Sequence, residues 1–138
     1  MHTEHLTNVK TYWVASGWFI SVAVASAILL FMEGVGLLGR SEVLDAVWIS
    51  VAVAVGFGTG GFFVGFRVAA APILHGGAMA GTTFVVWFLS NIAVGGVTTG
   101  VSAWEPLTRA AALALLVQGG AAVLGCWIGY RYAPVRVE

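Results

Sequence analysis

Four long apolar runs constrain this chain more than any other feature of its sequence. They cover residues 12–32, 44–66, 75–94 and 107–130, and polar connections separate them. A helix needs about 20 consecutive apolar residues to cross the hydrocarbon core of a bilayer. Every backbone polar group in that core must be bonded internally, which favours a helix for each run. The runs predict an all-α integral membrane protein with four transmembrane helices, and residues 1–138 as a single domain.

The composition is typical of an integral membrane protein. Hydrophobic residues make up 59% of the chain and charged residues 9%, too little polar surface to cover a water-soluble protein of this size. The formal net charge is zero and like charges form no block, so we expect the lipid bilayer and no nucleic acid as a partner. Ala25-Ser26-Ala27 imitates a signal-peptide cleavage site, but the apolar run continues past it, so we expect the first helix to be retained.

Basic residues near the ends of the runs are divided unequally between the two predicted sides of the membrane. One side has Lys10, Arg67, Arg131 and Arg136, and the other has Arg40 and Arg109. Basic residues are enriched on the cytoplasmic side of membrane proteins. The division favours a multi-pass protein of the cell membrane with both termini in the cytoplasm, with an inverted or dual orientation as the alternative.

A seven-residue motif occurs twice, at the end of the second run and at the end of the fourth. Residues 61–67 and 125–131 both read Gly, any residue, aromatic, Val or Ile, Gly, aromatic, Arg, and the copies lie 64 positions apart. A repeat at about half the chain length predicts two related two-helix halves. We expect the second and fourth helices to pack Gly61 and Gly65 against Gly125 and Gly129 about a pseudo-two-fold axis along the membrane normal.

Small residues recur at intervals of four through the last three runs. The candidate helix-packing positions are Gly56, Gly60, Gly61, Gly65, Gly77, Gly81, Gly125 and Gly129. Positions i and i+4 lie on one face of a helix, and small residues there let two backbones approach closely. We interpret them as packing positions inside the bundle, and the alternative is a face kept flat for a partner subunit or a flat ligand.

Four residues are candidates for a polar site: Glu33, His75, Asn91 and Gln118. Glu33 follows the first run and is interpreted as an acid of the first connection; the alternative is an intramembrane acid paired with Arg40 or Arg109. We interpret Asn91 and Gln118 as groups that bond neighbouring helices, with a pore lining as the alternative.

Histidine and cysteine do not form a recognisable chemical site. His2 and His5 belong to the polar N-terminal segment, and His75 is interpreted as an interfacial residue near Arg67, so paired histidine ligands for a haem are not expected. Cys126 is the only cysteine, which excludes an internal disulfide and a cysteine-based metal site. The runs carry no metalloprotease motif or phosphate-binding loop. We expect no catalytic residue, no cofactor and no metal, and therefore not an enzyme.

The middle of the chain resembles a known group of membrane proteins. Residues 60–67, GGFFVGFR, followed by residues 73–81, ILHGGAMAG, resemble the YrzE-like small bacterial four-helix membrane proteins. The resemblance covers about the middle third of the chain. It implies four helices, with a glycine-rich second helix that ends in a basic residue and a histidine-glycine opening to the third helix, and it brings no established activity.

Two classes of function follow from the sequence. A set of residues loosely echoes the small dimeric fluoride channels, although the order of the motifs differs: Gly60, Gly61, Arg67, Thr82, Thr83, Phe84 and Asn91. A conduit needs a continuous polar route, and the runs contain few polar groups. We therefore expect a non-catalytic subunit or accessory component of a larger membrane complex, as a homo-oligomer or with other membrane subunits. The alternative is a small oligomeric channel or transporter.

Overall fold

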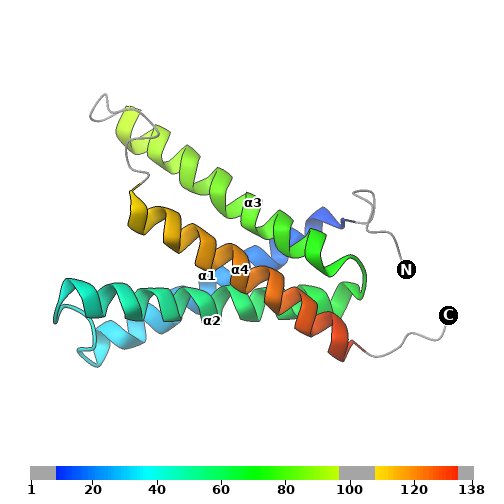
Figure 1. Ribbon diagram of the computed structural model, residues 1–138, viewed down its shortest axis with the longest axis horizontal. Coiled ribbons are helices and arrows are strands. Elements are labelled where there is room, and N and C mark those ends of the chain that lie inside the picture. Colours follow the sequence, from blue (N-terminus) through cyan, green and yellow to red (C-terminus); the bar gives the residue numbers. More distant parts are fainter. Residues whose placement is uncertain (1–8, 97–107, 134–138) are drawn as a thin grey trace.

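The computed structural model describes residues 9–96 and 108–133, and four long helices contain most of them. They are α1 (Thr11–Gly34), α2 (Glu42–Val68), α3 (Pro72–Asn91) and α4 (Arg109–Tyr132), and a π-helical turn, η2 (Ile92–Gly96), extends α3 (Figure 1). Each of the four is long and apolar enough to cross a membrane. The prediction of an all-α chain with four such helices is confirmed.

Polar caps set several helix ends outside the apolar runs. The Ser41 hydroxyl accepts a hydrogen bond from the Leu44 N–H at 3.3 Å, and the Thr108 hydroxyl accepts one from the Ala111 N–H at 3.2 Å. These bonds satisfy N–H groups that have no partner within the first turn of a helix. Pro72 starts α3 three residues earlier than the apolar run predicts, at a position where its missing N–H costs least.

The connection between α1 and α2 is a compact loop tied by its own charged residues. Gly36 and Gly39 have φ angles of +70° and +83°, which side chains rarely tolerate. The Gly39 N–H donates to both Asp45 carboxylate oxygens at 3.0 and 3.1 Å, and Arg40 Nε donates to the Gly36 carbonyl at 2.7 Å. Arg40 therefore contributes to the shape of the loop.

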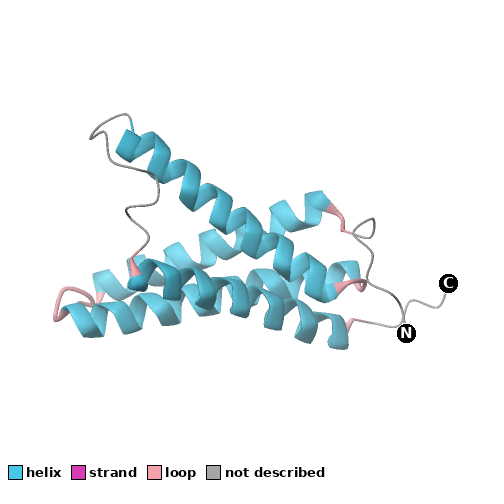
Figure 2. Ribbon diagram, turned by 45° about the horizontal axis from the view of Figure 1, so that its top comes forward, coloured by secondary structure: helices cyan, strands magenta, loops and turns pink. Residues whose placement is uncertain are grey.

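Two helices form the centre of the fold. α2 and α4 run in the same direction and cross, α1 packs along α2, and α3 packs along α4 (Figures 1 and 2). α1 also contacts α3, so both outer helices lie on the same side of the central pair. The helices lie closest near the α2–α3 turn and spread apart toward the opposite end (Figure 1). Buried apolar side chains at the helix contacts include Phe57, Val64, Met79 and Cys126.

The contact between α2 and α4 is formed by glycines, which have no side chain to keep the two backbones apart. A Cβ atom at Gly61 would meet the carbonyl of Ala122, and one at Gly65 would meet the carbonyl of Cys126. From the other helix, Cβ atoms at Gly125 and Gly129 would meet the carbonyls of Gly58 and Phe62. The two backbones are therefore in direct contact through the four glycines of the repeated motif.

The contacts across this seam are reciprocal. Gly61 lies against Ala122 and Cys126, and Gly125 lies against Gly58 and Phe62. Each member of the second set differs from its counterpart in the first by the same 64 positions that separate the two sequence motifs. Such reciprocity is the property of a two-fold interface, in which residue i contacts j and the equivalent of j contacts the equivalent of i. The central pair is a pseudo-two-fold pair within one chain.

We expect Gly65→Ala and Gly129→Ala to lower stability by about 1–3 kcal/mol, because a methyl group at either position requires the two backbones to separate. Thermal unfolding in a mild detergent measures this. Gly77→Ala is the matched control, since its added methyl group would meet no atom and alanine is the better helix former. Equal loss of stability in all three variants would contradict the seam.

The turn between α2 and α3 contains two strained alanines. Ala69 has a φ of +51° and Ala71 a φ of +42°, left-handed conformations that usually require glycine. Ala69 is the C-cap of α2, and its N–H donates to the Gly65 carbonyl at 3.1 Å. The short turn is therefore held at a cost in backbone energy.

We expect Ala69→Gly to raise the unfolding free energy by about 0.5–1 kcal/mol, because glycine adopts a positive φ without strain. The neighbouring Ala70→Gly should lower it, since Ala70 is not among the positive-φ residues and gains only flexibility. Chemical or thermal unfolding of the two variants beside the parent protein decides this, and a gain for Ala70→Gly with a loss for Ala69→Gly would refute it.

Candidate functional site: the cavities between the spread helices

Two hollows open where the helices spread apart. One, of about 690 Å³, lies between the first half of α2 and α4, and its wall includes Glu42, Ser50 and Val117. The other, of about 290 Å³, is lined by all four helices: Trp18, Val22, Ala25, Ser26, Leu29, Val53, Phe57, Thr83, Val86, Trp87, Leu115 and Gln118. Both walls are mainly apolar. Hollows of this kind suit hydrocarbon or another helix better than a hydrated solute.

Gln118 is the most informative polar residue in the smaller cavity. Its Oε1 atom is buried and has no hydrogen-bond partner in the described part of the chain. This oxygen therefore forms no bond to a neighbouring helix there. A buried amide oxygen without a donor costs about 1–3 kcal/mol, more than an apolar side chain of similar shape at the same place.

Trp18 and Thr83 join α1 to α3 across the same cavity, a link that the sequence analysis missed. Trp18 Nε1 donates to Thr83 Oγ1 at 3.1 Å, and Thr83 Oγ1 donates to the Met79 carbonyl at 3.1 Å. Thr83 is thus satisfied as donor and acceptor. The two residues are 65 positions apart, and no local pattern in either run marks them as a pair.

His75 is completely buried between the helices at the end of the bundle where α1 begins, and its interfacial position in a membrane stays a prediction. Its Nε2 accepts a hydrogen bond from the backbone N–H of Lys10 at 3.1 Å, and its Nδ1 lies 2.9 Å from the Ala71 carbonyl oxygen. A carbonyl can only accept, so Nδ1 carries the proton and Nε2 is the acceptor. The imidazole therefore bonds the start of α1 to the first turn of α3.

The structure also describes the other two polar candidates, Glu33 and Asn91. Glu33 belongs to the last turn of α1 and is exposed, because the helix continues beyond the apolar run; it is not a residue of the connection. Asn91 donates through Nδ2 to the Trp87 carbonyl of its own helix at 2.8 Å, so this bond does not join two helices. The four polar candidates are not brought together into one site.

The glycine candidates divide into two groups. Gly56 and Gly60 lie against Ser21 and Gly17 of α1, beside the seam glycines that contact α4. Gly77 and Gly81 are exposed, and a Cβ atom at either would meet no atom within 4 Å. The interpretation of these last two as packing positions inside the bundle is wrong for the described chain.

The hydroxyl groups of the helices are used locally. Ser16, Ser21, Ser50, Thr59 and Thr82 each donate to the carbonyl four residues earlier in the same helix, at 2.8–2.9 Å. Residues 9–96 and 108–133 contain no group of three or more His, Cys, Asp or Glu side chains that could hold a metal ion. These five hydroxyl groups therefore bond within their own helices.

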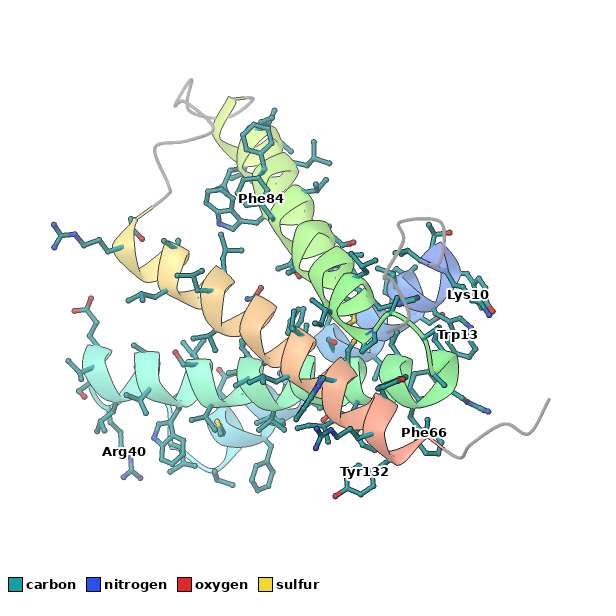
Figure 3. All side chains as sticks on the ribbon, turned by 45° about the vertical axis from the view of Figure 1, so that its right-hand side comes forward. Lys10, Trp13, Arg40, Phe66, Phe84 and Tyr132 are labelled. Atoms are coloured by element: carbon teal, nitrogen blue, oxygen red, sulfur yellow. The ribbon has the colours of Figure 1, made fainter. Side chains whose placement is uncertain are left out.

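Figure 3 shows which labelled side chains lie at each end of the helix bundle. Lys10 and Trp13 at the start of α1 lie at the same end as Phe66 of α2 and Tyr132 of α4, and Arg40 lies at the opposite end. Arg131 stacks over the Trp127 ring at 4.2 Å. The described start of α1 and the described end of α4 therefore lie at the same end of the molecule.

Comparisons of the chain with protein-family models, curated proteins and solved structures give no match.

We expect Gln118→Leu to raise the thermal stability of the detergent-solubilised protein, since it removes an unpaired buried amide oxygen and leaves an apolar group of similar size, a change worth about 1–3 kcal/mol. Gln118→Glu, which keeps the shape but buries a carboxyl group, should lower it. A loss of stability in Gln118→Leu would contradict an unpaired amide and indicate a bonding partner.

Proposed function

We propose that this chain is a multi-pass integral membrane protein that acts as a non-catalytic subunit of a larger membrane complex. The observation that carries the proposal is the one-sided covering of the central helix pair. α1 and α3 lie on one side of α2 and α4, and the other side holds an open groove of about 500 Å³. Its lining is Ala54, Val55, Gly58, Thr59, Phe62, Ala121, Leu124, Gly125 and Ile128.

The floor of this groove suits a helix. Gly58 and Gly125 leave it low, while Val55, Leu124 and Ile128 form its exposed rims, with 48%, 61% and 41% of their surfaces accessible. Helices in lipid associate through close packing at small residues, because lipid tails are as apolar as the side chains they would replace. A groove of this shape offers a partner helix more contact than a smooth helix surface.

The orientation proposed with it places both termini in the cytoplasm. Lys10, Arg67 and Arg131 belong to the end of the bundle where α1 begins and α2 and α4 end, whereas Arg40 and Arg109 belong to the other end. Arg136 lies outside the described residues. Reporter fusions at the two termini, expressed in cells, test this, and a periplasmic or extracellular signal from either would contradict it.

Association can be separated from folding at Gly58. A Cβ atom there would meet no atom of the chain within 4 Å, and Gly58 lines the groove, so Gly58→Leu should fold while its side chain fills the groove. Native mass spectrometry from mild detergent or lipid should show species larger than the 14.4 kDa chain for the parent protein and a loss of them in Gly58→Leu. Ala23→Leu, on the exposed side of α1, is the control and should associate like the parent.

A parent protein that is only monomeric in lipid and carries no other subunit would overturn the proposal. A small conduit is the second candidate, favoured by the cavity at Gln118 that all four helices line. The test is the flux of ions across the membrane of vesicles that contain the purified protein. A flux that Gln118→Leu reduces and Ala23→Leu leaves unchanged would support that candidate instead.

A further inference from the structure

The two sides of the central pair are equivalent in their seam but not in their covering. On α2, the edge that α1 covers includes Gly56, Gly60 and Val64. The positions 64 residues later on α4 are Gly120, Leu124 and Ile128, which are exposed on the open side.

The relation also holds in the other direction. α3 covers α4 at Gly119 and Val123, where it places Ala80 and Gly76. The positions 64 residues earlier on α2 are Val55 and Thr59, which line the open groove. The pseudo-two-fold axis therefore relates the edges that carry helices to edges that carry none. The open side thus holds the symmetry-equivalent positions of the covered surface, with larger side chains such as Leu124 and Val55 as rims where the covered side has Gly60 and Gly119.

The chain also displays a helix face of the required chemistry. α3 lies on α4 through the small residues Gly76 and Ala80, and the next residues along, Gly77 and Gly81, form an exposed small face four residues apart. A Cβ atom at either position would meet no atom of the chain within 4 Å. One helix therefore has two small faces, of which its own bundle uses one.

We propose that the open α2/α4 groove of one copy receives the Gly77/Gly81 face of α3 from a second copy. This inference rests on the proposed function and names the partner of the groove. Two copies in one bilayer with the same orientation place this α3 antiparallel to the α2 and α4 that receive it, as it is within its own chain. Groove and helix face are different surfaces, so the contact is head-to-tail and continues from copy to copy, closing into a ring where the rotation permits.

Depth in the membrane identifies the residues that meet. Gly58 and Ala122 are equivalent under the pseudo-two-fold relation, and Ala122 contacts Gly76 of its own chain. Gly76 and its neighbour Gly77 therefore lie at about the depth of Gly58. Copies that share a bilayer should bring Gly77 of one chain close to Gly58 of the next.

Disulfide cross-linking in native membranes tests the pair. Cys126 is buried and is the only cysteine, so Cys126→Ala provides the background. In it, Gly58→Cys combined with Gly77→Cys should give dimers and a ladder of higher species on oxidation, and each single variant should stay monomeric. Gly58→Cys combined with Ala23→Cys is the matched control, because Ala23 is exposed on α1 within about a turn of the same depth, and it should give no ladder.

Each contrary result has a distinct meaning. Cross-linking of Gly58→Cys alone would indicate a symmetric contact between two grooves, and equal cross-linking with Ala23→Cys would indicate random collision; either overturns the inference. A large complex in native mass spectrometry without a Gly58–Gly77 cross-link also overturns it, since a different occupant then fills the groove while the proposed function stands. A lone monomer in both measurements overturns the inference and the proposed function together.

Discussion

Direct backbone contact between α2 and α4 is the constraint on which the rest of this fold depends. The four helices are long and apolar enough to cross a membrane, and in a bilayer burial of apolar area alone would not hold them together, because lipid tails are as apolar as leucine; close van der Waals contact would. Gly61, Gly65, Gly125 and Gly129 permit that contact because a Cβ at any of them would strike the carbonyl of the opposite helix. The outer helices then pack on a pair whose geometry is already fixed, and α1 uses Gly56 and Gly60 in the same way.

The sequence predicts the four helices and the contact between α2 and α4 because both depend on the spacing of residues along the chain. Run length determines that a segment is a helix able to span a membrane, and a motif repeated at 64 positions aligns the glycines that meet. Spacing says which residues share a face but not where the face points, which is why Gly77 and Gly81 were placed inside the bundle and are exposed instead. The hydrogen-bond partner of His75 could not be read from its neighbours in sequence, because the Lys10 N–H lies 65 positions away.

The hydroxyl groups of the helices and Gln118 satisfy their hydrogen bonds in different ways. Serine and threonine hydroxyls bond to the carbonyl one turn earlier, which satisfies them without a partner helix. Glutamine cannot do this as easily, because its longer side chain carries the amide away from its own backbone. Gln118 accordingly extends into the space between the helices and leaves Oε1 unpaired, so the candidate polar site is a consequence of side-chain length as much as of position.

The one-sided covering of a pseudo-symmetric pair has a cause in the chain itself. Residues 69–71 connect α2 to α3, and three residues span at most about 10 Å, roughly one helix diameter. α3 must therefore begin beside the end of α2. The bond from the Lys10 N–H to His75 then holds the start of α3 next to the start of α1. A short turn and one buried imidazole thus place both outer helices on one side, and the symmetry of the seam leaves an equivalent surface unoccupied on the other.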